Sequence, residues 1–196
     1  MKQPTTNGWR TVDIVVASVL GVAFGVIFWA WSLLWNGPAD AIPLPARAVI
    51  YGVWLVPAVL GGLVVRKPGA AFYTETVAAL VSVALGTTWG WTLVLQGPIQ
   101  GIAAEVAFAL FAYRLWRLPV AMVAAAFAGL AAGVYDKVAW YPGADFPWVS
   151  FGIPFILITV ASSMVIAGFG SWALTRALAQ TGVLDPFPSG RERALV

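Results

Sequence analysis

The stretch VDIVVASVLGVAFGVIFWAWSLLW, residues 12–35, decides the class of fold. It is longer than the roughly 20 apolar residues that a helix needs to cross a bilayer. It is also too long for the apolar core of a signal peptide, so we expect it to be retained as a membrane span. Across the chain, 61% of the residues are hydrophobic and 10% are charged, which indicates an integral membrane protein.

Outward from this stretch, apolar runs between polar or Pro/Gly breaks predict an all-α membrane protein with six transmembrane helices. The predicted helices run from Val12 to Trp35, Ala48 to Val65, Ala70 to Gly86, Trp91 to Tyr113, Leu118 to Lys137 and Trp148 to Arg176. Residues 1–180 would form one membrane domain. We expect residues 181–196 to form a short cytoplasmic tail, loosely ordered unless it docks.

The distribution of Lys and Arg predicts the orientation of this bundle in the membrane. Nine cations fall in the joints on one side, and Arg47 and Lys137 fall on the other side, which accounts for all eleven. The side rich in cations is normally cytoplasmic. We therefore expect both termini in the cytoplasm of a prokaryotic cell and the joints 36–46, 87–90 and 140–147 outside.

Several functions are excluded or disfavoured by residues that the sequence lacks. Without His or Cys, the chain has no ligands for a typical zinc site and no Ser-His or Cys-His nucleophile, so we expect neither an enzyme nor a metal site. No Gly-x-x-x-x-Gly-Lys-Ser/Thr loop is present to hold ATP. The formal net charge of +3 comes from cations at segment ends and does not indicate nucleic-acid binding.

Polar side chains inside the predicted spans are the candidate functional residues, because ionisable groups in a membrane usually face a bundle interior or a cavity. Glu75 shares an inward face of the third helix with Ser82, seven residues later. On the fourth helix Gln96 and Gln100 share one stripe, while Glu105 lies about 180° from Gln96. For each acid, a structural role near the cytoplasmic cations is an equal alternative.

Aromatic residues gather near the predicted outer face, including Trp29, Trp31, Trp35, Trp89, Trp91, Trp140, Tyr141 and Trp148. An interfacial belt explains any one of them, but a plain belt should decorate both faces. Some of these rings therefore suit a pocket for a flat or cationic ligand. Tyr51, Trp54 and Tyr135 are belt, core or pocket candidates, and Asp136 is either a pocket acid or the partner of Lys137 in a solvated pair.

Small residues recur at every fourth position on the first helix, at Ala17, Gly21 and Gly25. Such a strip lets another helix backbone approach closely. The partner is either another helix of this bundle or a second membrane protein.

Four segments carry a resemblance to a known family: YGVWLVPAVLGGLVVRKPGAAFYTETVAAL, GPIQGIAAEVAFAL, LPVAM followed by VYD, and ALAQTGVLDPFPSGRE. Together they resemble the substrate-binding S components of energy-coupling factor (ECF) transporters, of the YkoE type associated with thiamine or its hydroxymethylpyrimidine precursor. The resemblance runs in order from about Trp9 to Glu192.

The resemblance implies a six-helix S component that binds a vitamin from outside and docks on a transmembrane T component driven by two ATPase subunits. The substrate-binding residues that it implies, or that would stack on such a ligand, are Tyr51, Trp54, Glu75, Trp89, Gln100, Glu105, Tyr135 and Asp136. It implies no cofactor in this chain. The alternative is a stand-alone proton- or cation-coupled transporter that uses Glu75 and Glu105 as a relay, although inverted repeats of broken helices are not apparent.

Overall fold

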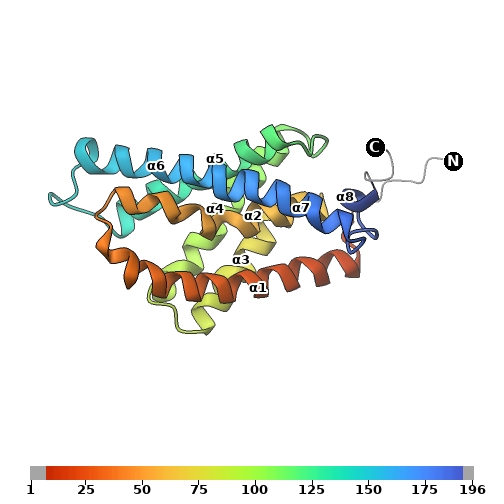
Figure 1. Ribbon diagram of the computed structural model, residues 1–196, viewed down its shortest axis with the longest axis horizontal. Coiled ribbons are helices and arrows are strands. Elements are labelled where there is room, and N and C mark those ends of the chain that lie inside the picture. The colour runs from red at the N-terminus through yellow and green to blue at the C-terminus, as the bar shows by residue number, and fades with distance from the viewer. Residues whose placement is uncertain (1–7, 192–196) are drawn as a thin grey trace.

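The computed structural model describes residues 8–191, which form helices joined by short loops (Figure 1). The helices are α1 (Thr11–Trp35), α2 (Val56–Val65), α3 (Ala70–Ala84), α4 (Leu93–Leu110), α5 (Leu118–Ala139), α6 (Ile153–Ser163), α7 (Gly170–Gln180) and α8 (Pro188–Arg191). Short 3-10 segments lie at Pro38–Ala41, Ala46–Leu55 and Gly90–Thr92, and π-helical turns lie at Trp148–Gly152 and Met164–Phe169.

Among the described residues, five helical runs are long and apolar enough to cross a membrane. They are Thr11–Trp35, Ala46–Val65, Gly90–Leu110, Leu118–Ala139 and Trp148–Gln180. The prediction of six such spans is therefore not confirmed as stated, because α3 is apolar but has 15 residues. At 1.5 Å per residue it is roughly 22 Å long, less than the ~30 Å of a hydrocarbon core.

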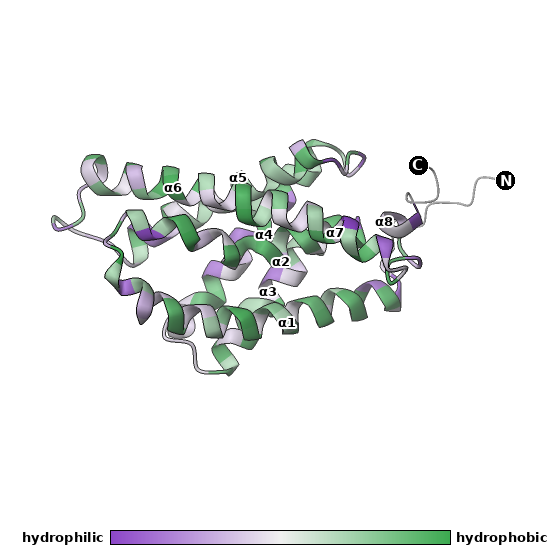
Figure 2. Ribbon diagram, in the orientation of Figure 1, coloured by the Kyte–Doolittle hydropathy of each residue, from purple (hydrophilic) through white to green (hydrophobic). Residues whose placement is uncertain are grey.

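Hydrophobic and hydrophilic residues are distributed differently along the long axis of the bundle. In Figure 1, α1 lies along one side and α6 and α7 lie along the other, with α2 in the middle. Hydrophobic residues prevail along these helices, and hydrophilic residues are prominent where α1 begins and α8 lies (Figure 2). This is the pattern of a bundle that meets lipid along its length and water at its ends.

The central position of α2 depends on close helix contacts. All ten of its residues are buried. A Cβ at Gly61 would lie 2.2 Å from Thr74 Oγ1 on α3, and one at Gly62 would lie 2.4 Å from Phe108 on α4. Since real Cβ atoms do not approach other atoms so closely, glycine is what allows both helices to contact α2 directly.

The small-residue strip on α1 packs within the chain. Ala17, Gly21 and Gly25 are buried, and a Cβ at Gly21 or Gly25 would lie 2.7 Å or 2.5 Å from the Cβ atoms of Val77 or Val81 on α3. In this structure the strip is the surface on which α1 meets α3. Its contacts support the intramolecular alternative over an interface with a second protein.

The end of the bundle where α1 begins is closed by an ion-pair cluster around Asp13, which is fully buried. Arg10 Nη2 lies 2.7 Å from Asp13 Oδ1, and Lys67 Nζ lies 2.7 Å from Asp13 Oδ2. Arg10 also donates to the carbonyl oxygen of Pro186. The cluster therefore ties the start of α1 to the α2–α3 loop and to the C-terminal segment.

The segment predicted as a tail packs against the bundle as far as it is described. Leu184 and Phe187 are 4% and 1% exposed, and Ser189 Oγ donates to the carbonyl oxygen of Val64 at 2.9 Å. Residues 181–191 are thus docked rather than extended. Residues 192–196, and the cations Lys2 and Arg193 used for the orientation, lie outside the described residues.

Candidate binding cavity

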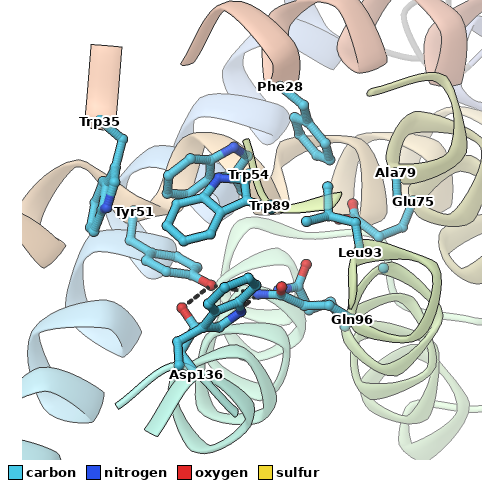
Figure 3. Close-up of a pocket in the computed structure, with 13 residues that line it drawn as sticks. Phe28, Trp35, Tyr51, Trp54, Glu75, Ala79, Trp89, Leu93, Gln96 and Asp136 are labelled. Atoms are coloured by element: carbon cyan, nitrogen blue, oxygen red, sulfur yellow. Dashed lines mark hydrogen bonds between the residues drawn. The ribbon is translucent and has the colours of Figure 1, made fainter. Parts of the chain in front are cut away.

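A narrow cavity lies inside the bundle, toward the end away from the Asp13 cluster (Figure 3). Its volume is about 30 Å³, room for roughly two water molecules. The described residues that line it are Phe28, Trp35, Tyr51, Trp54, Glu75, Ala79, Trp89, Leu93, Gln96, Gly97, Gln100, Asp136 and Trp140. Aromatic rings thus surround a small set of carboxyl, amide and phenol groups.

The 3-10 segment Ala46–Leu55 supplies two of these rings. A 3-10 helix has three residues per turn, so Tyr51 and Trp54 lie on one face, and both are buried. Ser162 of α6 fixes the segment, because its hydroxyl donates to Val49 O and accepts from the N–H of Gly52. A Cβ at Gly52 would lie 2.6 Å from Ser162 O, so glycine is needed for this approach.

Three side chains from three different elements form a polar network on one wall of the cavity (Figure 3). Tyr51 Oη donates to Asp136 Oδ2 at 2.7 Å. Gln96 Nε2 donates to Asp136 Oδ1 at 2.7 Å and to Tyr51 Oη at 3.0 Å. Each carboxyl oxygen of Asp136 therefore has a donor, which buried polar groups require.

Glu75 of α3 faces the same cavity from another side, near Ala79 (Figure 3). Its Oε2 accepts the backbone N–H of Ala58 at 2.9 Å, one of the N–H groups left without a partner in the first turn of α2. Its Oε1 is buried and has no hydrogen-bond partner among the described residues. An unsatisfied buried oxygen costs about 1–3 kcal/mol, and a donor from a ligand would recover that cost.

Four of the aromatic rings that line the cavity form a connected chain. The ring centroids of Trp35 and Trp54 are 5.0 Å apart, those of Trp54 and Trp89 are 6.1 Å apart, and those of Trp89 and Trp140 are 5.0 Å apart. Trp89 belongs to the loop before α4, and Trp140 follows α5. These two loop-borne rings are therefore the parts of the wall that helix packing holds least firmly.

Six of the eight residues predicted to bind substrate line the cavity. They are Tyr51, Trp54, Glu75, Trp89, Gln100 and Asp136. Their common position supports, but does not test, a role in binding.

Glu105 does not line the cavity. Its carboxyl oxygens accept the backbone N–H groups of Gly69, Ala71 and Phe72, at the start of α3, and the hydroxyl of Tyr113. Burial, followed by the hydrogen bond to Glu105, raises the pKa of Tyr113, so this hydroxyl stays protonated and donates. The contacts of Glu105 are those of a helix cap, the structural alternative left open by the sequence.

Tyr135 also lies away from the cavity, and its hydroxyl donates to the carbonyl oxygen of Thr92 at 3.1 Å. Its neighbour Asp136 points inward, whereas Lys137 Nζ donates to Tyr141 O and lies 4.8 Å from the ring of Trp148. Asp136 and Lys137 are 7% and 3% exposed. The alternative of a solvated Asp136–Lys137 pair is therefore wrong.

Gln96 is the polar cavity residue that the predicted set of binding residues omits. Its spacing of four from Gln100 placed it on the same stripe, so the signal was present in the sequence. The cavity is also lined by Phe28 and by two residues of the outer aromatic set, Trp35 and Trp140, none of which was among the eight predicted binding residues. Nothing in their spacing separates them from interfacial aromatic residues.

Comparisons with known proteins agree with this architecture. Residues 12–131 match the family described as "ABC-type cobalt transport system, permease component". The chain is 31% identical over 191 residues to YkoE of Bacillus subtilis (strain 168), a protein named as an HMP/thiamine permease, and the match covers 95% of this chain and 92% of that one. It also superposes on a crystal structure of an S component of an ECF transporter with a TM-score of 0.89 and 31% identity, over 95% of this chain and 94% of the other.

The fold and the comparisons define a multi-pass membrane protein of a transporter class, whose relatives are transport components rather than enzymes. The chain belongs to the S components of ECF transporters, of the YkoE type.

Proposed function

We propose that this chain is the specificity component of an ECF importer that binds thiamine or its hydroxymethylpyrimidine precursor from the outside. The observation that carries the proposal is Glu75 Oε1, a buried carboxyl oxygen without a partner among the described residues, in a cavity lined by aromatic rings. The name of the Bacillus subtilis relative supports the choice of ligand. A transmembrane T component and two ATPase subunits would supply the energy for inward delivery.

The lining groups match the chemistry of an aminopyrimidine. This ring carries an exocyclic amine that donates hydrogen bonds and ring nitrogens that accept them. Glu75 Oε1 would accept from the amine, and Gln100, which also lines the cavity, would fix the ring's orientation. Trp54 and Trp89 would stack on the ring, and the aromatic faces together with Asp136 would balance the charge of a thiazolium.

The cavity must widen before such a ligand can enter, because a volume of about 30 Å³ holds no heteroaromatic ring. Displacement of Trp89 and Trp140 is the change that disturbs the fewest helix contacts, since neither lies within a helix. We therefore place the entrance between these two rings.

We also propose an orientation of the chain in the membrane. In this proposal residues 1–180 form a membrane domain whose chain crosses the bilayer six times, and α3 is the shortest crossing. Arg47 and Lys137 lie toward the cavity end, whereas Arg10, Arg66 and Lys67 lie at the opposite end. This charge asymmetry supports cytoplasmic termini in a prokaryotic plasma membrane, with the cavity opening outward.

The test is a titration of the purified full chain in detergent with thiamine and, separately, with hydroxymethylpyrimidine, followed by calorimetry and tryptophan quenching. We expect saturable binding with a Kd from nanomolar to low micromolar, corresponding to about 8–12 kcal/mol. The tighter ligand identifies the substrate. Failure of a folded, monodisperse sample to bind either compound would overturn the vitamin assignment and leave the family assignment standing.

A further inference from the structure

A second and wider cavity lies at the other end of the bundle, among the ends of α2, α5 and α7. Its volume is about 740 Å³. We call it the arginine groove, because Arg66, Arg117 and Arg176 all line it. Arg66 follows α2, Arg117 precedes α5, and Arg176 lies in α7, so three separate elements each supply one arginine to the groove.

The arginine groove is positively charged, and its described lining residues include no Asp or Glu. Two of its cations are held over tryptophan rings, since Arg66 Cζ lies 5.6 Å from the centroid of Trp116 and Arg176 Cζ lies 4.8 Å from that of Trp172. The N-terminus of α5 opens into the groove at Arg117 and adds the positive end of a helix dipole. An anion bound near Arg117 and Arg176 would offset their positive charge.

Guanidinium groups favour a phosphate as that anion. Arg presents N–H donors in a planar fork that pairs with phosphate oxygens two at a time. The cation-π contact of Arg176 already restricts its side chain, so less freedom is lost when an anion binds. Because Arg66 also donates to Leu63 O, where α2 ends, Arg117 and Arg176 carry the argument.

The surface that leads away from the groove indicates that the phosphate belongs to a lipid. Val165, Phe169, Trp172 and Arg176 follow one another at helical spacings of four, three and four, so they form one stripe. Val165 and Phe169 are 62% and 51% exposed, and the ring of Phe169 contacts that of Trp172. An apolar path therefore runs along the continuous helix from the groove toward the middle of the membrane.

We propose that the arginine groove binds the phosphate of an anionic phospholipid in the leaflet at this end, with an acyl chain along the Val165–Trp172 stripe. Basic pockets between membrane helices commonly hold anionic headgroups, and tryptophan is typical of the headgroup level. A free phosphate would contact the same guanidinium groups but would leave the exposed Val165–Trp172 stripe uncovered. An experiment can therefore distinguish a lipid phosphate from a free phosphate.

The test uses the full chain in detergent and measures bound lipid by native mass spectrometry and affinity by calorimetry. The ligands are dioctanoyl phosphatidylglycerol, dioctanoyl phosphatidylcholine and inorganic phosphate. We expect the anionic lipid to bind at least tenfold more tightly than the zwitterionic lipid with the same chains. The two lipids carry the same phosphodiester, so equal binding would show that the groove does not recognise net negative charge and would overturn the proposal. Inorganic phosphate binding as tightly as the anionic lipid would overturn the lipid as the source of the phosphate.

Matched variants locate the site. Arg117→Gln and Arg176→Gln should each weaken binding of the anionic lipid at least fivefold, whereas Arg114→Gln removes an exposed cation that does not line the groove and should change it less than twofold. Arg176→Lys keeps the charge and loses the fork, so it should restore part of the affinity. An equal loss in all three Gln variants would mean nonspecific charge attraction and overturn the proposal. Vitamin binding, measured in the same samples, should be unchanged in each and reports folding.

Discussion

Glu75 and Glu105 lie in neighbouring helices, and both accept hydrogen bonds from backbone N–H groups. They differ in how many of their carboxyl oxygens have a partner among the described residues. Each accepts a backbone N–H from the first turn of another helix or the loop before it, Glu75 at α2 and Glu105 at α3. Both oxygens of Glu105 are satisfied, by three N–H groups and the Tyr113 hydroxyl. Glu75 accepts from α2 through one oxygen, and its other oxygen faces the cavity without a partner among the described residues.

This difference shows how to distinguish an acid that only stabilises the fold from an acid that can bind a ligand. Position in the sequence does not distinguish them. A carboxyl oxygen that accepts an N–H group at a helix N-terminus is stabilising in both cases, so a cap alone indicates nothing about ligands. What distinguishes Glu75 is the remaining acceptor capacity in a buried place where water has little room. The same Glu→Gln change at the two positions should therefore give different results.

The largest effect is expected for Glu75→Gln. The amide oxygen can still accept from Ala58, but an NH₂ group then replaces Oε1 and meets the donor of the ligand. We expect affinity for the vitamin ligand to fall tenfold to a hundredfold, by calorimetry in detergent, because a buried donor left without an acceptor costs about 1–3 kcal/mol. An unchanged affinity in a folded variant would show that Glu75 is purely structural, like Glu105.

The matched change Glu105→Gln should act on stability instead. It replaces one carboxyl oxygen with an NH₂ group, which cannot accept, so two of the four donors around Glu105 lose their acceptor. We expect the free energy of unfolding to fall by about 1 kcal/mol, visible as a lower midpoint of thermal unfolding in detergent. Ligand affinity should stay within twofold of the parent, and a tenfold loss would contradict the distinction drawn between the two acids.

The smallest effect is expected for Tyr51→Phe, which keeps the ring and removes one hydroxyl from the polar network. The network loses two of its three hydrogen bonds, those between Tyr51 Oη and Asp136 Oδ2 and between Gln96 Nε2 and Tyr51 Oη, but Asp136 retains its 2.7 Å hydrogen bond from Gln96. We expect a two- to fivefold loss of affinity by the same titration, or about 0.5–1 kcal/mol.

Tyr113→Phe is the matched control for Tyr51→Phe, because it removes the same hydroxyl from the cap around Glu105. The affinity of the Tyr113→Phe variant for the vitamin ligand should equal that of the parent chain. A loss greater than twentyfold for Tyr51→Phe would mean that its hydroxyl contacts the ligand directly.

The positions of the helices could be read from the sequence to a large extent. The predicted Leu118–Lys137 and the observed Leu118–Ala139 differ by two residues, and the run predicted from Trp148 continues to Gln180. Apolar length and Pro or Gly breaks are local signals, which explains this agreement. The 3-10 form of Ala46–Leu55 was not predicted, because it is held by Ser162, more than a hundred residues away.

The candidate site was only partly accessible to the same reasoning. The occurrence of polar residues inside apolar runs selected Glu75, Gln100 and Asp136, which line the cavity, and also Glu105, which does not. Tyr135 and Asp136 are adjacent in sequence, yet one bonds to Thr92 outside the cavity and the other joins the network within it. The rotation of a helix about its axis decides which of two adjacent side chains faces the cavity. Membrane helices are apolar on most sides, so their sequences show little periodicity from which this rotation can be predicted.

The sequence by itself determined that this protein is a helical membrane protein, where most of its helices lie and which family it belongs to. These properties depend on composition, on runs of neighbouring residues and on the order of motifs along the chain. The tertiary structure decided which acid keeps an acceptor without a partner among the described residues, which helix the Ala17 strip contacts and which three arginines line one groove. Each of these depends on contacts between residues distant in sequence, where a displacement of a few ångströms changes which hydrogen bonds can form.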